Sequence, residues 1–246
     1  MMRFGDLTFE EIRECAQNAW LVVVPTGCTE QHGPHLPVDF DTWFAEAICL
    51  AAASRATELY GVHALVLSPL PFGPTPEHRT FGYGFIDLPV ELHHEVLLAV
   101  MNSLADQGFK KLILWRGCGQ HVLMPVVKRF NELRNGQAQA FYLPPPYHQI
   151  WMQIGNPQNP GGHADAFETS MALYMRPEAV RLERIINPCN EPLDWDTPYL
   201  DLTQYTQTGV IGDPTEASAE LGARLWKAVV EEMARGFKQV AESDLA

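Results

Sequence analysis

Basic residues are scarce in this chain. Its 246 residues include 17 Lys and Arg against 30 Asp and Glu, which gives a formal net charge of -13 and a pI near 5.0. A chain of this charge repels nucleic acids and anionic membranes at long range, so we expect neither as a partner. A small-molecule substrate is the more natural expectation.

Long apolar runs and closely spaced cysteines are also missing. Each apolar run is far shorter than the roughly 20 residues of a membrane span, and the first residues lack the basic, apolar and small-residue pattern of a signal peptide. The five cysteines, at positions 15, 28, 49, 118 and 189, form an odd set that suits a reducing compartment better than a disulfide framework. We therefore expect a soluble, cytoplasmic protein.

Short apolar runs alternate with helical patterns along the chain. The runs, each bounded by Gly or Pro, predict strands at 19–25, 63–70, 110–115 and 138–143. Helical spacing predicts helices at 42–60, 89–107, from near 121 to before 136, and from 215 to about 237. This alternation predicts an α/β fold in which a mostly parallel sheet carries helices on both sides. The length suits one domain, residues 1–246, with an irregular stretch at 187–209 that forms a surface excursion or an oligomer contact.

The most informative segment follows the first predicted strand. It reads Thr-Glu-Gln-His-Gly-Pro-His-Leu-Pro from residue 29 to 37 and continues as Val-Asp-Phe-Asp to residue 41. Glu30 and His32 point the same way in an extended segment, so each can reach one of two neighbouring metal ions, and Asp41 can bridge them. The ordinary alternative is a polar loop with a solvated acid and with Asp41 as the N-cap of the next helix.

Polar loops also follow the second and third predicted strands. Glu77 and His78 lie on a loop stiffened by Pro and Gly, where the alternative is a rigid turn with exposed charges. The segment Arg-Gly-Cys-Gly-Gln-His at 116–121 offers Cys118 or His121 as a fourth ligand. Cys118 has the alternative of being a small buried apolar residue, as free cysteines usually are.

A glycine loop and a helix follow the fourth predicted strand. His163 and Glu168 are five residues apart, about 140° around a regular helix, so both cannot face one site from within the helix. His163 must therefore lie on the loop while Glu168 points inward from the first turns. An inward glutamate among apolar residues needs a cation or strong hydrogen bonds, and the alternative is an acid that interacts with the helix dipole.

Taken together, these motifs resemble the creatininase (creatinine amidohydrolase) family over nearly the whole chain. The matching segments are 30–37 with Asp41, Glu77-His78, 162–164 with 168–170, and Gly-Asp-Pro at 212–214. The resemblance implies a three-layer α/β/α sandwich, a homo-oligomer often described as a hexamer, and a centre of up to two divalent metal ions. It implies Glu30 and His32 as ligands, Asp41 as the bridge, Glu168 as a completing ligand and His163 as the proton carrier.

The chain departs from the family pattern at Cys118. The family's third strand ends in Asn-Gly-His-Gly-Gly-Asn with the His as ligand, whereas this chain has Arg116 in place of the Asn and Cys118 in place of the His. A thiolate ligand would bias the site toward zinc, with manganese or iron as the alternatives. The cation of Arg116 supports the opposite interpretation, a lost site in a non-catalytic binding protein, or else meets an anionic group of the substrate.

The resemblance implies a metal-dependent hydrolase, and the preferred hypothesis is an amidohydrolase acting on a cyclic amide or another carbon–nitrogen amide bond. His163 would pass a proton to the departing nitrogen, and Glu77 and His78 would orient the substrate. Trp151 or Tyr147 would cover the pocket. The alternatives are a formamide hydrolase, a peptide-maturation enzyme or a ring-opening hydrolase of an oxidised cyclitol. The remaining alternative is an enzyme with Cys118 as nucleophile, assisted by His121 or His163.

Overall fold

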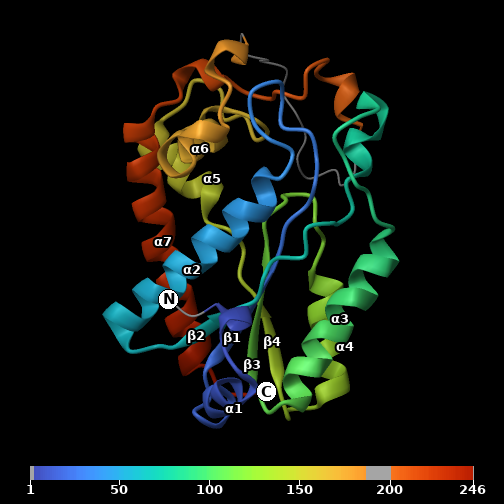
Figure 1. Ribbon diagram of the computed structural model, residues 1–246, viewed down its shortest axis with the longest axis vertical. Coiled ribbons are helices and arrows are strands. Elements are labelled where there is room, and N and C mark those ends of the chain that lie inside the picture. Colours follow the sequence, from blue (N-terminus) through green and yellow to red (C-terminus); the bar gives the residue numbers. More distant parts are fainter. Residues whose placement is uncertain (1–2, 187–200, 246) are drawn as a thin grey trace.

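A parallel four-stranded sheet forms the centre of the protein (Figure 1). The computed structural model describes residues 3–186 and 201–245. The strands are β1 Leu21–Thr26, β2 Ala64–Val66, β3 Lys111–Arg116 and β4 Gln139–Tyr142, in the order β2-β1-β3-β4. All three neighbouring pairs are parallel. The predicted strands are therefore confirmed, although the second is shorter than its apolar run.

Helices cover both faces of this sheet. They are α1 Phe9–Gln17, α2 Phe40–Tyr60, α3 Val90–Asp106, α4 Met124–Arg134, α5 Tyr147–Ile150, α6 Ala166–Met175 and α7 Ala219–Glu242. Figure 1 shows α2 and α7 along one face and α3 and α4 along the other. This arrangement confirms the predicted three-layer α/β/α sandwich.

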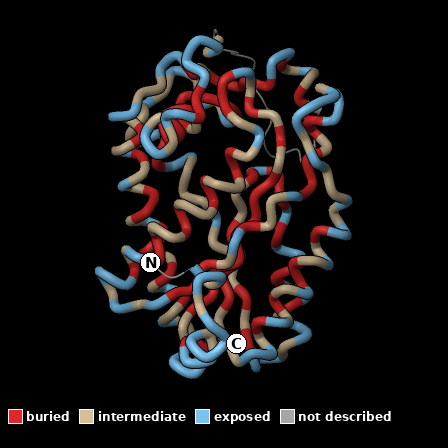
Figure 2. Tube along the Cα trace, in the orientation of Figure 1, coloured by how far each residue is buried: buried red, intermediate tan, exposed pale blue. Residues whose placement is uncertain are grey.

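Two apolar clusters hold the layers together, and the strands contribute to both. Leu21 and Val23 of β1 pack into the cluster with α2 and α7, whereas Val22 and Val24 pack into the cluster with α3 and α4. This alternation follows from the period of two in a strand, and Figure 2 shows buried residues concentrated along the middle of the molecule. Full burial of each aliphatic side chain contributes about 1.5–3 kcal/mol, so the sheet gives the loops at its edge a rigid base.

One detail of the predicted helix boundaries is wrong, and it concerns Asp41. Helix α2 begins at Phe40, so Asp39 occupies the N-cap position and Asp41 lies in the first turn. The side chain of Asp39 makes no capping bond and instead pairs with Arg176, at 3.1 Å. Asp41 is 4% exposed and is therefore available to the interior rather than to the helix end.

The remaining elements follow the predictions with shifted ends. The third predicted helix begins at Met124, and the last one begins at Ala219, where the Ser218 hydroxyl accepts a hydrogen bond from the Leu221 amide. Of the stretch predicted to be irregular, residues 187–200 lie outside the described part, and the rest contains one short 3-10 helix, Leu202–Gln204.

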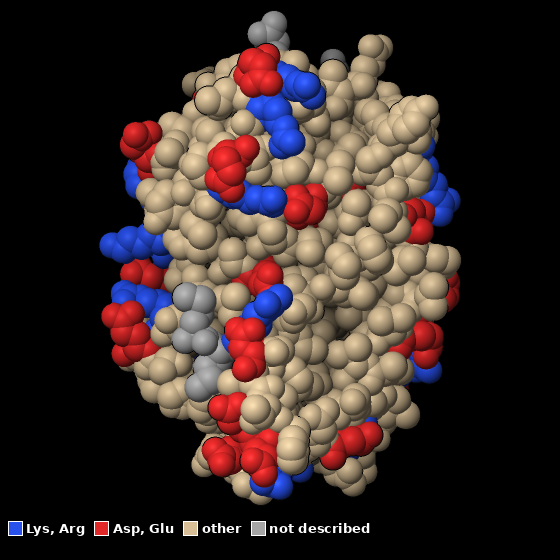
Figure 3. Space-filling model, viewed as in Figure 1, with Lys and Arg blue, Asp and Glu red and all other residues tan. Residues whose placement is uncertain are grey.

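The distribution of surface charge and the hydropathy of the helices agree with the composition. Figure 3 shows acidic and basic side chains in small mixed groups, without a broad basic patch on the face in view. Within residues 3–186 and 201–245, no helix has the length and apolar character needed to cross a bilayer.

Candidate metal centre

The carboxyl ends of β1 and β3 bring two loops to the same point, as parallel strands do. Thr26 of β1 is in register with Arg116 of β3, and each strand is followed by Gly and then Cys. A Cβ on Gly27 would lie 2.5 Å from Thr42 Cα, and one on Gly117 would lie 2.7 Å from the Thr26 carbonyl oxygen. Because glycine lacks that atom, both loops press against the start of α2. Cys28, Cys118 and Asp41 meet there.

Thiols and carboxylates form the first donor group of the centre. Cys28 Sγ lies 2.9 Å from Glu30 Oε2 and 3.0 Å from Asp41 Oδ2, and Cys118 Sγ lies 3.6 Å from Glu30 Oε2. One ligand atom from each of these four residues lies within 4.8 Å of the others, and all four side chains are buried. A single ion could therefore contact all four.

An imidazole and a carboxylate form the second donor group. His32 Nδ1 donates a hydrogen bond to the Glu30 carbonyl oxygen at 3.0 Å, which leaves Nε2 facing Asp41 Oδ1 at 3.3 Å and Glu168 Oε2 at 4.0 Å. Nε2 is buried without a well-aligned hydrogen bond. A ring held through one nitrogen by a backbone carbonyl, with the other directed at carboxylates, is the usual arrangement of a metal-binding histidine.

Asp41 joins the two groups. Its Oδ2 contacts the thiol of Cys28, and its Oδ1 contacts the imidazole of His32. A carboxylate with one oxygen in each of two ligand sets can bridge two ions. Asp41, which the sequence predicted as a bridging ligand, therefore lies between the two groups, in the first turn of α2 instead of at its N-cap.

The loop before α6 supplies His163 and Glu168. His163 Nε2 donates to the Gln31 carbonyl oxygen at 2.7 Å, and its Nδ1 lies 3.8 Å from Glu30 Oε1. Ala164 adopts a left-handed backbone with φ of 50°, which turns the chain into α6. Glu168 lies in the first turn of α6 and accepts a hydrogen bond from the Ala164 amide at 2.6 Å. Both residues lie where the sequence predicted them, on the loop and facing inward.

Glu77 and His78 lie on a 3-10 helix, η2 Pro76–Phe81, beside the first donor group. His78 Nε2 lies 3.4 Å from Glu30 Oε1, so this ring faces a candidate ligand. Glu77 is 2% exposed, and neither of its carboxyl oxygens has a hydrogen-bond partner among the described residues. Burial, together with Glu30 and Asp87, raises the pKa of Glu77 to about 9.

The charges of the cluster attract cations. Burial alone would lower the pKa of His32, but Asp41, Glu168 and Glu30 raise it to about 10. Burial raises the pKa of Glu168 well above its ordinary value, and burial and the neighbouring Cys118, Glu30 and Asp41 raise that of Cys28. Protons therefore occupy these groups when no other cation does, and metal ions compete for the same atoms.

His163 differs from His32 in charge. Burial lowers the pKa of His163 well below its ordinary value, and His32 and His78 lower it further. A neutral ring whose Nε2 already donates has a lone pair on Nδ1, the atom that faces the cluster. This is the state that accepts a proton.

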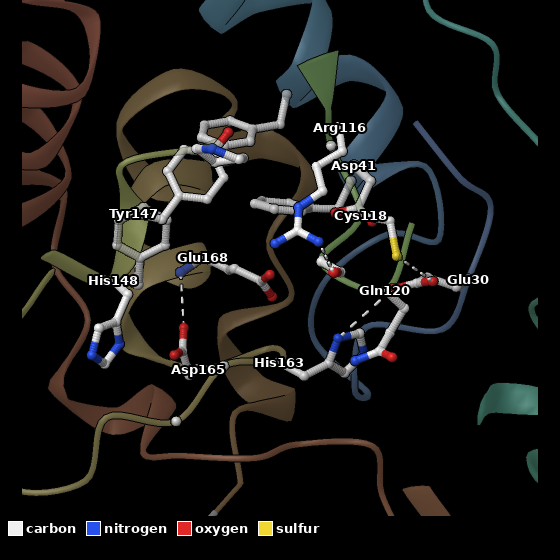
Figure 4. Close-up of a pocket in the computed structure, with 18 of the residues that line it drawn as sticks. Glu30, Asp41, Arg116, Cys118, Gln120, Tyr147, His148, His163, Asp165 and Glu168 are labelled. Atoms are coloured by element: carbon white, nitrogen blue, oxygen red, sulfur yellow. Dashed lines mark hydrogen bonds and ion pairs between the residues drawn. The ribbon is translucent and has the colours of Figure 1, made fainter. Parts of the chain in front are cut away.

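A cavity of about 380 Å³ opens beside both donor groups (Figure 4). Arg116, Tyr147 and Trp151 line it together with Glu77, His163 and Glu168. Figure 4 shows the guanidinium of Arg116 directed into the space between Glu168 and the Cys118–Glu30 pair. Its Nη1 donates to the Gly119 carbonyl oxygen at 2.6 Å. The aromatic residues expected over the pocket thus form part of its wall.

The structure brings together the residues predicted for the site. The prediction omitted one residue of the cluster, and one predicted residue is an exception because it lies partly outside the cluster. The omission is Cys28, which the spacing of the cysteines did not connect with Cys118, although the same Gly-Cys pair follows both strands. The exception is His121, whose Nδ1 lies 3.0 Å from the Thr26 hydroxyl while its ring packs beside His93 of α3. It nevertheless lies within ligand distance of the two thiols.

Comparisons with known proteins agree with one another. The family model described as creatinine amidohydrolase matches residues 5–237. A mycofactocin precursor peptide peptidase of Mycobacterium tuberculosis is 31% identical over 87% of this chain and 83% of the relative. A 3-dehydro-scyllo-inosose hydrolase of Thermotoga maritima is 26% identical over 97% and 83%.

Solved structures repeat the fold. A mutant creatininase of zinc–zinc type superposes with a TM-score of 0.83 at 23% identity, covering 98% of both chains. A creatininase titled with manganese gives a TM-score of 0.83 at 22% identity, covering 98% of this chain and 99% of that one.

Proposed function

The chain belongs to the creatininase family of metal-dependent hydrolases, and we propose that it hydrolyses a carbon–nitrogen amide bond in a small molecule. The observation that carries this proposal is the position of Asp41. Its two oxygens face two separate donor groups at the floor of a cavity. Two adjacent ions held in this way are suited to hydrolysis, since such ions lower the pKa of water and polarise a carbonyl oxygen.

The residues fit the ions by the chemistry of their donors. We propose Glu30, Asp41 and Cys118 for one position and His32, Asp41 and Glu168 for the other. The orphaned Nε2 of His32 and the close approach of Cys28 to two carboxylates support this assignment. Zinc is the preferred ion because thiolate and imidazole are borderline to soft ligands, and manganese or iron is the alternative.

We propose that His163 moves the proton. Its Nδ1 faces the cluster, and its Nε2 is fixed by the Gln31 carbonyl, so the ring can accept a proton from water and deliver it to the departing nitrogen. Glu77, buried and without a hydrogen bond beside the cavity, is proposed to orient the substrate. His78 shares that role and, through its contact with Glu30, also positions a ligand.

Arg116 bears on the chemical class of the substrate. It is a cation among the carboxyl groups Glu30, Asp41, Glu77 and Glu168 that line the same cavity. Its guanidinium points into the open space, as Figure 4 shows, while one nitrogen anchors the loop at Gly119. We propose that it binds a carboxylate or another anionic group of the substrate. A peptide or an amino-acid amide has such a group.

Further properties belong to the same proposal. The free thiols of Cys15, Cys28, Cys49 and Cys118 suit the cytoplasm. One sheet between two helical layers supports a single domain over 1–246.

Exposed apolar side chains at Tyr83, Ile86 and Leu92 support a homo-oligomer, for which the family suggests a hexamer. Light scattering of the purified protein tests the assembly.

Chelation with a substrate panel tests the function. The panel contains a carboxylate-bearing peptide amide, a cyclic amide, a formamide and an oxidised cyclitol. We expect amide hydrolysis that disappears after chelation and returns with zinc. Full activity in metal-free protein would overturn the proposal. Less than about half an ion per chain after reconstitution, with no turnover on the panel, would favour a non-catalytic binding protein instead.

Loss of turnover to a thiol reagent in metal-free protein would instead indicate a cysteine nucleophile. Elemental analysis of Cys118→Ala and Cys118→His completes this test. Full metal content in Cys118→Ala would remove that residue from the ligand set, whereas Cys118→His should retain the ion, because imidazole replaces the thiolate.

A further inference from the structure

We propose that Cys28 is a second thiolate ligand, so that one of the two metal positions is a two-thiolate site for a thiophilic ion. This inference rests on the proposed function, since it concerns the composition of one of its two metal positions. It changes that position from one sulfur to two. The ligand set becomes Cys28, Glu30, Asp41 and Cys118.

Backbone register places the two thiols side by side. Thr26 and Arg116 are paired across β1 and β3, and Cys28 and Cys118 each come two residues later. The Gly117 amide donates to the Thr26 carbonyl oxygen at 2.6 Å, and the Thr42 hydroxyl donates to the Cys28 carbonyl oxygen at 3.0 Å. These bonds fix both loops, so the approach of the thiols is a property of the backbone.

The contacts of Cys28 call for a cation. Its sulfur lies 2.9 Å from one carboxylate oxygen and 3.0 Å from another. A thiol has one hydrogen and can donate it to only one of them. The second contact then brings lone pairs together in a site that is fully buried, which is costly without a compensating charge. With a metal ion bound among the sulfur and the two oxygens, each close contact would become a distance between two ligands of the same ion.

The dimensions agree with a tetrahedral ion. Zinc–sulfur bonds of about 2.3 Å and zinc–oxygen bonds of about 2.0–2.2 Å give ligand–ligand edges of about 3.3–3.8 Å. The sulfur–oxygen separations here are 2.9, 3.0 and 3.6 Å, and all four ligand atoms lie within 4.8 Å of one another. A sulfur–oxygen edge with these bond lengths is about 3.5–3.7 Å, so the two shorter contacts would lengthen by about 0.6 Å when the ion binds.

Two sulfurs make this position selective. Thiolates favour zinc, cobalt or cadmium over manganese and magnesium, whereas the His32, Asp41 and Glu168 position has only nitrogen and oxygen donors. The two positions should therefore fill with different preferences. A thiophilic ion should enter the two-thiolate site first.

X-ray absorption at the zinc edge of the reconstituted wild-type protein tests the inference directly. With zinc content measured on the same sample, we expect two sulfur neighbours per chain at about 2.3 Å. One sulfur per chain would mean that only one of the two thiols binds the ion, which would overturn the inference while the proposed function would stand. Failure to bind zinc at all would overturn both.

Cobalt spectroscopy of variants provides the second measurement. In the cobalt-substituted protein, thiolate-to-cobalt absorption in the near ultraviolet should fall about twofold in each single variant, Cys28→Ser or Cys118→Ser. It should disappear in the double variant. Cys15→Ser is the matched control, because Cys15 is a buried free thiol on α1 at the opposite end of the sheet (Figure 1). An unchanged band in folded Cys28→Ser would contradict the inference.

Discussion

The two donor groups that share Asp41 differ in their chemistry. On one side lie two thiols and the Glu30 carboxylate, supplied by the loops after β1 and β3. On the other lie the His32 imidazole and the Glu168 carboxylate, supplied by the β1 loop and the first turn of α6, with the His163 ring beside them. The thiols of the first side are soft donors fixed by strand register. The second side has borderline and hard donors, of which His32 donates a hydrogen bond to a backbone carbonyl and Glu168 accepts one from a backbone amide. Substitution of a ligand on one side should therefore affect metal binding differently from substitution of a ligand on the other side.

Removal of the shared carboxylate should have the largest effect. In Asp41→Ala both sides lose a ligand, so the loss of metal-derived stabilisation should lower kcat/KM by about 10³-fold or more. Metal content by elemental analysis should fall for both ions. The control is Asp39→Ala, two residues earlier, whose half-exposed side chain pairs with Arg176. Wild-type metal content in Asp41→Ala would refute the bridge.

His163 separates proton transfer from metal binding. Replacement by Gln should lower kcat by about 10²–10⁴-fold, the usual contribution of a general acid–base residue. Both ions should remain, because the proposed ligand sets do not need this ring. His63→Gln, an exposed histidine stacked on Trp20, serves as the control. Loss of one ion from His163→Gln would move the residue into the ligand set.

Glu168 distinguishes the two sides most sharply. Its replacement by Gln should release the ion on the imidazole side and reduce activity by about 10²-fold, in the range expected when one ligand sphere is weakened. The cobalt–thiolate band of the other side should keep its intensity. Glu178→Gln, an exposed acid beyond α6, provides the comparison. Equal loss of both ions would mean that the sides do not bind independently.

Arg116 tests substrate recognition across the two sides. Loss of charge-assisted hydrogen bonds worth about 1.5–3 kcal/mol should raise KM for an anionic amide about 10–150-fold in Arg116→Ala. The neutral analogue of that amide should show little change. Arg129→Ala, an exposed arginine on α4 paired with Glu95, is the control. An equal effect on both substrates would indicate that Arg116 acts by anchoring the loop at Gly119.

The last prediction concerns stability instead of activity, through Glu77. Its pKa in the folded protein is about 9 against an ordinary value of 4.5, so the folded state holds a proton that the unfolded state releases. Stability of the chelated protein should therefore fall as pH rises from about 4.5 toward 9, by at most about 1.4 kcal/mol per pH unit from this group. Urea unfolding at several pH values should give a flatter profile for Glu77→Gln. A metal ion beside Glu30 should also flatten it, so a slope that persists with zinc would argue against an ion on that side.

The sequence was sufficient for the order of strands and helices and for most of the residues that gather in the candidate centre. Crowded donors after an apolar run predicted Glu30, His32 and Asp41 as ligands, and the angle between His163 and Glu168 placed one on the loop and the other in the helix. The position of Asp41 was harder, because helix ends are set by competing caps, and Asp39 occupies that place.

Cys28 shows what sequence patterns leave out. Its link to Cys118 depends on the direct pairing of β1 with β3, which brings together Thr26 and Arg116, 90 residues apart in the sequence. The order of elements predicts parallel strands but does not give their neighbours. The repeated Gly-Cys after both strands was the available signal, and it acquires meaning only once the two strands are known to be adjacent.

The central claim is that Asp41 joins two ligand sets, and the most direct measurement is the number of zinc ions bound per chain by the chelated and reconstituted wild-type protein. Equilibrium dialysis with elemental analysis should give two ions, the first bound more tightly and lost selectively in Cys28→Ser and Cys118→Ser. A stoichiometry of one, unaffected by Asp41→Ala, would contradict the account.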